Sequence, residues 1–446
     1  MRFAIATLGC KVNQYDSALI EARLASVGMT RAEFGQQADV YIVNTCTVTD
    51  RADAESLRLA RRARRLNPKA RVIMTGCLAQ ANPTLLAQAP EVDAVVGLGR
   101  GDDLERAAAG YAEERVMVSN LRKQIAPIET GAVALEGHTR AFLKLQEGCD
   151  QFCSFCIVPI SRGSSRSVPP RQIIEALDRL AARGFKEVIL SGVHLGGYGR
   201  DLEPPVELEK LLEMLAERSP INRLRLSSLD PEELSEGIIS IISQSAKFCP
   251  HLHLPLQSGE DETLARMRRR YSAEYFRERV ETVLAAMPDA AIGTDLIVGF
   301  PGETSRQFEH YFNFVESLPL AYFHVFPYSV RSGTTAAKLG GRVQAGEIKR
   351  RAGLMRELGE RRRRDFARRF IGRTVKVLVE EKLPDGSWRG YSPNYLRVLT
   401  ESSVELTNSE VEVEVEGSLA EGAQLVGRIV PAARACAGGF TARLRA

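Results

Sequence analysis

Six of the eight cysteines form two groups of three, at spacings suited to metal or redox chemistry. In one group, three residues separate Cys149 from Cys153 and two separate Cys153 from Cys156. The other group is spread over the first 80 residues and consists of Cys10, Cys46 and Cys77. A cubane 4Fe–4S cluster held by three thiolates leaves one iron free to bind another molecule. The sequence therefore predicts two reactive clusters, each with an open iron.

Each cysteine of the spread group follows a short apolar run, at residues 3–6, 40–43 and 72–74. Helix-like stretches separate these runs, and this alternation is typical of a parallel sheet that is buried on both faces. Because parallel strands end at the same edge of the sheet, cysteines 36 and 31 positions apart become neighbours in space. We predict a Rossmann-like parallel α/β domain over residues 1–115. The alternative is three unrelated buried thiols, since cysteine is a common core residue.

A second alternation begins at Ala141 and predicts a partial, open (β/α)6 barrel over residues 141–371. The close cysteine group lies on the loop after the first of its strands. A closed zinc site is the alternative for these three thiols, but residues 157–161 offer no fourth ligand. The six expected strands are 142–148, 187–193, 223–229, 252–257, 292–299 and 323–328. The expected helices are 170–183, 206–217, 231–245, 260–286, 304–317 and 344–370.

The remainder of the chain is predicted to hold a linker, a small β-domain and a tail. Residues 116–140 contain Pro127, Gly131 and Gly137 and are interpreted as the linker. Residues 372–433 contain short β-rich pieces and predict a small barrel of OB-like size, a type that often binds nucleic acid. Glu and Val alternate strictly at 410–416, so one face of that strand is acidic and does not meet phosphate. Residues 434–446 are the tail.

Composition indicates a globular protein, with 44% hydrophobic and 26% charged residues. No apolar run approaches the length of a membrane span, and the N-terminus lacks an export signal, so we expect a cytoplasmic protein with no membrane partner. In that reducing compartment, cysteines serve metal or redox chemistry more often than disulfides. The formal net charge is only +4, but residues 348–374 carry eleven Lys or Arg against three acidic residues. With further basic segments at 51–71 and 268–270, a polyanionic partner is plausible, although each is also typical of a solvated helix face.

The close cysteine group resembles the signature of the radical S-adenosylmethionine superfamily, whose fold is a partial (β/α)6 barrel. Throughout its length, the chain is similar to the methylthiotransferases of that superfamily, which end in a TRAM domain like the β-rich region here. The segments that carry the resemblance are Leu8-Gly9-Cys10-Lys11-Val12-Asn13-Gln14, Asn44-Thr45-Cys46, Thr75-Gly76-Cys77, Glu147-Gly148-Cys149 and Ile157-Val158-Pro159.

The resemblance implies a role for each cysteine group. In this family the cluster of Cys149, Cys153 and Cys156 binds S-adenosylmethionine through its open iron and generates a 5′-deoxyadenosyl radical. The second cluster, on Cys10, Cys46 and Cys77, carries the sulfur that is transferred. S-adenosylmethionine is then both methyl donor and radical source, and no catalytic residue beyond the cluster ligands is expected.

The segment Gly9 to Gln14 resembles the branch that methylthiolates C2 of N6-threonylcarbamoyladenosine (t6A) at tRNA position 37, next to the anticodon. The implied partners are the tRNA anticodon stem-loop, a reduced electron donor such as flavodoxin or ferredoxin, and a sulfur donor. The alternatives are a methylthiotransferase for isopentenyl-adenosine tRNA or for a ribosomal-protein aspartate. A non-catalytic iron–sulfur protein that binds RNA or transfers electrons is disfavoured, since such carriers need no barrel cavity.

Contacts to S-adenosylmethionine are expected at the ends of the later strands. Glycine lets the backbone approach a ligand, while Ser, Gln and Asp bond ribose hydroxyls and amino groups. Turn chemistry explains the same residue types equally well. Single histidines near these strands, such as His194 and His253, are interpreted as structural. The predicted cofactor-binding residues are Gly192, Ser227, Gln257, Ser258 and Asp295.

Overall fold

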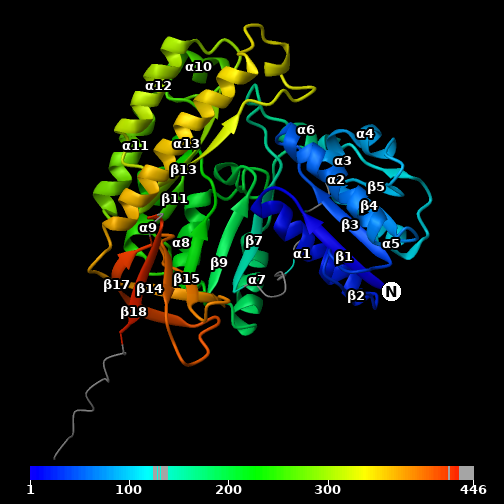
Figure 1. Ribbon diagram of the computed structural model, residues 1–446, viewed down its shortest axis with the longest axis horizontal. Helices are drawn as coiled ribbons and strands as arrows, with labels where there is room; N and C mark the ends of the chain where they lie inside the picture. Colours follow the sequence, from blue (N-terminus) through cyan, green and yellow to red (C-terminus); the bar gives the residue numbers. More distant parts are fainter. Residues whose placement is uncertain (124–127, 129–130, 132–138, 420–421, 431–446) are drawn as a thin grey trace, which may run out of the picture. The chain divides into compact units, whose positions relative to one another are not determined.

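The computed structural model describes residues 1–123, 128, 131, 139–419 and 422–430. The chain divides into two compact units, Met1–Arg363 and Arg364–Ala446 (Figure 1). The first unit holds a six-stranded sheet and an open barrel, and the second holds a small closed barrel. Within the described ranges, no helix is both long and apolar enough to cross a membrane.

The first sheet is parallel, in the order β2-β1-β3-β4-β5-β6. Its strands are β1 (Arg2–Thr7), β2 (Thr30–Arg31), β3 (Val40–Thr45), β4 (Arg71–Gly76), β5 (Ala94–Val96) and β6 (Val116–Met117). The accompanying helices are α1 (Lys11–Ser26), α2 (Asp50–Leu66), α3 (Cys77–Ala81), α4 (Pro83–Ala87) and α5 (Gly101–Ala109).

Helices cover both faces of this sheet, which explains why its central strand β3 is buried along its whole length. On one face, Tyr41 and Val43 of β3 share an apolar cluster with Leu59 of α2. On the other face, Ile42 shares a cluster with Leu24 of α1. The two buried faces hold the strand ends in place, and those ends carry the first three cysteines.

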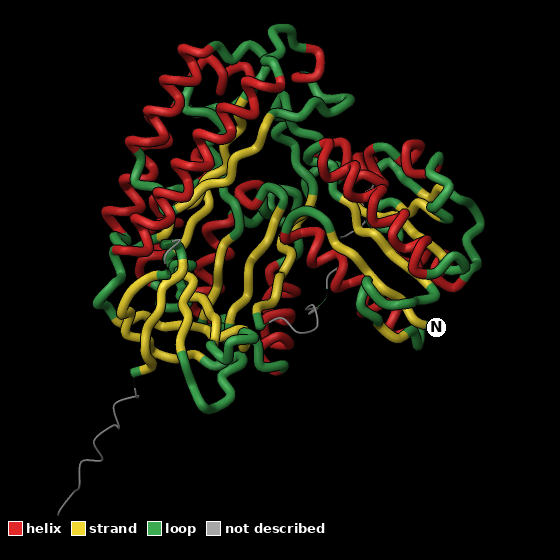
Figure 2. The backbone as a smooth tube through the Cα atoms, in the orientation of Figure 1, coloured by secondary structure: helices red, strands yellow, loops and turns green. Residues whose placement is uncertain are grey.

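The barrel consists of six parallel strands in the spatial order of the sequence, with helices outside them (Figure 2). The strands are β7 (Arg140–Glu147), β9 (Glu187–Gly192), β10 (Arg223–Leu226), β11 (His251–His253), β12 (Ala291–Val298) and β13 (Tyr322–Pro327). The short β8 (Arg166–Ser167) pairs antiparallel with β7. The helices are α6 (Val158–Ser161), α7 (Pro170–Ala182), α8 (Leu208–Arg218), α9 (Glu236–Gln244), α10 (Asp261–Arg266), α11 (Ala273–Ala286), α12 (Ser305–Ser317) and α13 (Ala345–Arg368).

Side chains on the two faces of the barrel strands differ sharply in polarity. Leu143, Leu224 and Leu252 belong to the large apolar cluster that the outer helices complete. Because successive strand residues point to opposite faces, the alternating positions face the barrel interior. These inner positions carry mostly polar or charged residues, among them Lys144, Glu187, Arg225, His253, Asp295 and His324. The barrel interior is therefore equipped to bind a polar ligand.

The second unit is a closed five-stranded barrel in the order β14-β15-β16-β18-β17. Its strands are β14 (Thr374–Lys382), β15 (Trp388–Tyr391), β16 (Arg397–Thr400), β17 (Glu410–Ser418) and β18 (Gln424–Ile429). Trp388, the only tryptophan, is buried in its core with Val413 and Val415. The alternation in β17 thus places valines inside, while Glu414 lies outside and pairs with Arg428.

The predicted fold class is confirmed: a parallel α/β sheet, a partial barrel and a small C-terminal barrel. Several predicted elements were wrong in detail. Residues 260–286 form two helices, because Arg268 takes a left-handed φ of 60° and Ser272 caps a new helix by accepting from the Tyr275 amide. Residues 231–245 begin as a 3-10 turn, and only Glu236–Gln244 are α-helical. Strand β15 was not predicted. Most of the expected linker, and the tail with Cys436, lie outside the described residues.

Candidate active site with two cysteine groups

Cys149, Cys153 and Cys156 lie on the loop between β7 and α6, at the carboxyl end of the first barrel strand. The loop is tight: the Cys149 amide donates to the Gly163 carbonyl at 3.0 Å, and the Cys156 amide donates to that of Cys153 at 3.0 Å. Gly148 precedes it with a φ of +76°, and a Cβ there would lie 2.0 Å from the Ser164 carbonyl oxygen. Only glycine fits this position.

The three thiols of this loop act on one another electrostatically. Burial, with a contribution from the neighbouring Cys153, raises the pKa of the Cys149 thiol to about 12. Burial raises the pKa of Cys156 to about 12, with Cys153 and Cys149 contributing. Thiols crowded in this way give up their protons readily only to a metal. The donor set therefore fits a three-thiolate cluster.

Arg269 supplies a fixed positive charge beside this group. Its guanidinium lies 3.4 Å from the Cys153 sulfur and also pairs with Asp230. Hydrogen bonds to cluster sulfurs and nearby charges tune cluster potential and stability. One interpretation of the basic segment 268–270 was a solvated helix face. Arg269 does not fit it, because its side chain turns inward to the cysteine loop.

Cys10, Cys46 and Cys77 follow β1, β3 and β4, which are adjacent strands of the first sheet. Gly9 packs so closely against Cys46 that a Cβ there would lie 2.9 Å from its sulfur. Burial raises the pKa of the Cys46 thiol to about 11, and Cys77 and Cys10 both act on it. The structure thus brings the three distant cysteines together at one sheet edge, with Cys10 exposed and the other two buried.

A buried network of charges joins the two cysteine groups. The Arg162 guanidinium lies 3.3 Å from the Cys77 sulfur and donates to Glu147 at 2.5 Å and to Asp16 at 2.9 Å. Lys144 completes the network, 2.8 Å from Asp16 and 2.9 Å from Glu147. Glu147 stands two residues before Cys149, so the network runs from one group to the other.

Burial would raise the pKa of Glu147, but Lys144 and Arg162 outweigh it and hold that pKa below its usual range. Two basic side chains thus face two acidic ones in this network. Sequence reasoning missed this network. The signal was available for Lys144, a charged residue at an alternating position within an apolar strand, but not for Arg162, whose partners lie 15, 85 and 146 residues away.

Two family profiles match this chain: Uncharacterized protein family UPF0004 over residues 2–97 and the Radical SAM superfamily over residues 143–315. The threonylcarbamoyladenosine tRNA methylthiotransferase MtaB of Bacillus subtilis is 37% identical over 420 residues, which cover 92% of this chain and 93% of the relative. The chain belongs to the radical S-adenosylmethionine methylthiotransferase family. It is accordingly an enzyme, a transferase that uses a 4Fe–4S cluster and S-adenosylmethionine.

This methylthiotransferase is also similar to a second relative in sequence and to a solved structure in fold. The tRNA-2-methylthio-N(6)-dimethylallyladenosine synthase of Parafrankia is 36% identical over 387 residues, covering 85% of this chain and 78% of the relative. The solved radical S-adenosylmethionine methyltransferase TsrM of Kitasatospora setae shares the fold, with a TM-score of 0.56, 14% identity, and coverage of 73% of this chain and 74% of its own. At that identity the likeness concerns the fold alone.

Four of the predicted cofactor-binding residues of this methylthiotransferase lie at or after the carboxyl ends of barrel strands, and the fifth, Asp295, lies within β12. The Gly192 amide, at the end of β9, donates to the Ser227 hydroxyl at 3.3 Å. Gln257 takes a left-handed φ of +68° and its amide donates to the Asp295 carbonyl at 2.8 Å. Ser258 is fully buried beside it. The five residues thus fall into two neighbouring sets, and their part in binding the cofactor remains a prediction.

One polar atom supports a ligand at these strand ends. The Ser191 hydroxyl is buried and has no hydrogen-bond partner among the described residues. Buried polar atoms are nearly always bonded, so an orphan in a barrel interior suits a ligand's hydrogen-bonding group. Ser191 was not among the predicted residues, although it directly precedes Gly192.

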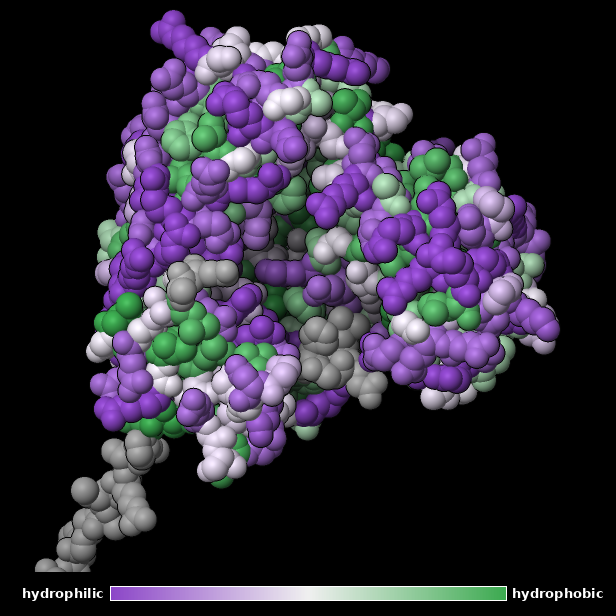
Figure 3. Space-filling model, viewed as in Figure 1, coloured by the Kyte–Doolittle hydropathy of each residue, from purple (hydrophilic) through white to green (hydrophobic). Residues whose placement is uncertain are grey.

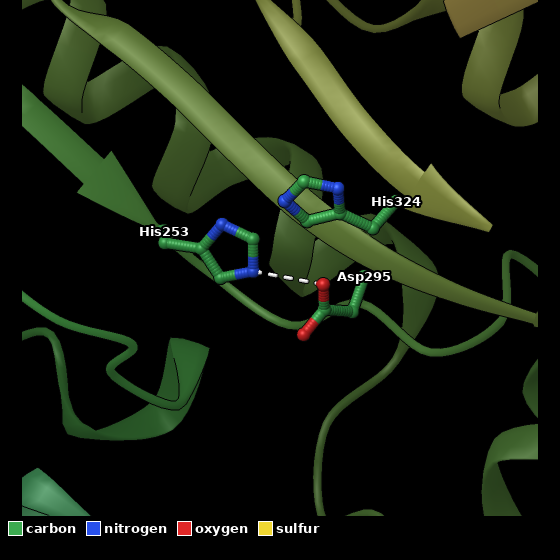
Figure 4. Close-up of side chains that lie close together, drawn as sticks. All are labelled: His253, Asp295 and His324. Atoms are coloured by element: carbon green, nitrogen blue, oxygen red, sulfur yellow. Dashed lines mark ion pairs between the residues drawn. The ribbon is translucent and has the colours of Figure 1, made fainter. Parts of the chain in front are cut away.

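Deeper in the barrel of this methylthiotransferase, a second polar group has formed. His253 and Asp295 point toward one another, with the His253 Nε2 3.0 Å from the Asp295 carboxylate, and His324 lies beside them (Figure 4). Burial lowers the pKa of His324, so its ring is neutral at pH 7. Nearby, Glu187 accepts from Arg225 at 2.7 Å and Arg223 at 2.9 Å. His253 is therefore hydrogen-bonded, as a structural histidine would be, but it faces the interior.

Proposed function

We propose that this methylthiotransferase adds a methylthio group to C2 of N6-threonylcarbamoyladenosine at position 37 of tRNA, with two 4Fe–4S clusters and S-adenosylmethionine. Two features support the proposal. The relative from Bacillus subtilis, matched over nearly the whole of both chains, is named for threonylcarbamoyladenosine tRNA. The chain also offers two groups of three cysteines, each set at the carboxyl ends of parallel strands.

The observation that carries the two-cluster part is the convergence of Cys10, Cys46 and Cys77. Three thiols from three strands meet where Arg162 reaches one of their sulfurs and also reaches Glu147, beside the other cysteine loop. The Arg162 charge is already paired with Glu147 and Asp16, and its Nε is left to donate to the Cys77 sulfur at 3.3 Å. A donor in this position suits a thiolate or a cluster sulfur, because hydrogen bonds to such sulfurs tune a cluster.

The chain's own residues would hold the reacting groups. Cys149, Cys153 and Cys156 would hold the first cluster, which with S-adenosylmethionine supplies the radical and the methyl group when bound. Arg269 would bond the Cys153 sulfur, and Arg162 would bond that of Cys77. The predicted set of Gly192, Ser227, Gln257, Ser258 and Asp295 would orient S-adenosylmethionine.

A tRNA partner suits the surface of the first unit. Hydrophilic side chains dominate the face in Figure 3. Exposed basic residues project from α2 and its C-terminal loop, namely Arg51, Arg58, Arg61, Arg62, Arg65 and Lys69. Such residues would neutralise phosphates and make RNA binding salt-dependent. A base in an anticodon loop is already partly unstacked, which lowers the cost of bringing its C2 to the site by about a few kcal/mol.

The test is anaerobic reconstitution followed by reaction with synthetic anticodon stem-loops. Loops carrying t6A, isopentenyl-adenosine or plain adenosine at position 37 would be incubated with the holoenzyme, and their nucleosides analysed by mass spectrometry. The proposal expects a methylthio product, heavier by one CH₂S unit, from the t6A loop. The Parafrankia relative makes isopentenyl-type tRNA the second candidate. Product from that loop alone would reject the t6A assignment and leave the family intact.

Partners and location follow as further predictions. A flavodoxin or ferredoxin would deliver the electron, a separate sulfur donor would refill the second cluster, and the enzyme would work in the cytoplasm. Turnover with each purified donor, against dithionite as reference, tests the first of these.

A further inference from the structure

Several charged side chains of the barrel interior pair with one another. Glu187 pairs with both Arg223 and Arg225, so one carboxylate meets two guanidinium groups. Asp295, higher in the barrel, is engaged with His253.

Lys11 brings a further cation from the first sheet domain to this interior. It is the first residue of α1, next to Cys10, and α1 packs against β7 and β9 of the barrel. The charges that act on its ammonium are those of the barrel, chiefly Arg225, Arg140, Glu187 and Asp295. Across the residues that the structure describes, no ion pair or side-chain hydrogen bond of Lys11 is formed. A partly buried cation without a partner favours an anionic group in the ligand.

The neighbouring polar group is able to bond a hydroxyl or an amide. His324 and Asp295 occupy paired positions on β13 and β12. The rings of His253 and His324 stack with centroids 5.7 Å apart (Figure 4). His324 is exposed to the barrel space, and the Asp295 side chain keeps 25% of its surface accessible. A carboxylate acceptor and a neutral imidazole thus lie open together beside Gln257, which bridges to Leu296.

We propose that Lys11 and His324 form the subsite for the threonylcarbamoyl substituent of the substrate, with Lys11 bonding its carboxylate. This inference rests on the proposed function. The substituent carries one carboxylate, one hydroxyl and a ureido group, whereas an isopentenyl group carries none of them. In adenine, C2 and C6 both flank N1, so a residue next to Cys10 is placed to meet the N6 substituent of a base whose C2 faces the second cysteine group. Lys11 and His324 are thus specificity-determining residues.

An apolar substituent in this place would bind unfavourably, and would not merely lack a favourable contact. It would displace water from the Lys11 ammonium and offer no acceptor in return. Sites built to bond a polar group discriminate strongly against analogues that lack it, because their own groups are then left unpaired. The same lysine therefore selects t6A and disfavours isopentenyl-adenosine.

The experiment pairs a change in the enzyme with a change in the substrate. Reconstituted wild-type enzyme and Lys11→Met would be assayed for kcat/KM, and for Kd without reductant, on a t6A loop and on a loop whose threonyl carboxylate is amidated. Wild-type enzyme should lose about 10- to 100-fold on the amide, the range for a hydrogen bond to a charged group. Lys11→Met should lose as much on t6A but treat the acid and the amide alike, within about twofold.

Lys186→Met is the matched control, because Lys186 is exposed between α7 and β9 and makes no ion pair among the described residues. It should keep the wild-type preference for the acid. Iron and sulfide contents report whether Lys11→Met still loads its clusters. If it does not, His324→Leu replaces it, with an expected loss of about 10-fold on t6A.

Two outcomes overturn the subsite. One is wild-type enzyme that turns over acid and amide equally, a measurement that needs no variant. The other is a loaded Lys11→Met enzyme that keeps the wild-type preference, or that loses activity on t6A and plain adenosine loops alike. Failure of the proposed function looks different, since the t6A loop would then give no methylthio product at all.

Discussion

Removal of the Arg162 guanidinium should be the most damaging single change to the buried network. Arg162 is 2% exposed and bonds Glu147 and Asp16. Arg162→Met preserves much of the volume but leaves two carboxylates facing one ammonium, Lys144. Breaking a buried ion pair from one side costs about 3–5 kcal/mol. We expect a loss of that size in the free energy of unfolding.

The assay is urea unfolding of the cluster-free protein, followed by circular dichroism at pH 7. Arg171→Met is the control, because Arg171 pairs with Glu175 on the surface of α7 and is 90% exposed; it should cost less than about 1 kcal/mol. Addition of Glu147→Gln to Arg162→Met should recover part of the loss, since it removes one of the two unbalanced carboxylates. A loss below about 1 kcal/mol for Arg162→Met, or no recovery in the double variant, would refute a balanced buried network.

Three further changes test other parts of the site. Cys10→Ala should lower the iron content of the reconstituted protein from about eight to about four irons per chain. An unchanged iron content would contradict the prediction that Cys10 holds a second cluster. Arg269→Met, which deprives the Cys153 sulfur of its donor, should cut S-adenosylmethionine cleavage by about 10- to 100-fold, while unaltered cleavage would make Arg269 a structural residue only. Arg225 and Arg223 outweigh burial and lower the pKa of Glu187 from its ordinary 4.5 to about 2. The ionised Glu187 therefore stabilises the folded form by about 3 kcal/mol above pH 4.5, and this contribution is lost as the pH falls toward 2. In Glu187→Gln, the free energy of unfolding should accordingly fall less steeply between pH 4.5 and pH 2 than in the wild type. A fall as steep as in the wild type would contradict that assignment.

The elements of this protein were largely predictable from local patterns. Continuous apolar runs identified the buried parallel strands, and their alternation with helices predicted both the sheet and the open barrel. Errors arose where single residues interrupt a pattern. The break at Arg268 depends on one left-handed residue, and the short strand β15 is held by pairing with β14 and β16 rather than by its own apolar content.

The candidate site likewise contains residues that were predictable from local patterns and residues that were not. The cysteine spacings indicated two groups of three thiols, because a strand followed by a cysteine is a local pattern that repeats. The partners of those thiols were not predictable. Arg162, Arg269 and Lys11 each act on groups far away in sequence, and nothing near them in the chain distinguishes them from ordinary surface cations.

By itself, the sequence determined the family, the fold class and the division of six cysteines into two groups of three. Each of these depends on residues close together or on repeated local patterns. Only the tertiary structure decided which charges stand between the two groups and which cation enters the barrel. The physical reason is that a charge acquires its role from burial and from its distance to other charges. Both quantities arise only when α1, β7 and the cysteine loop pack together.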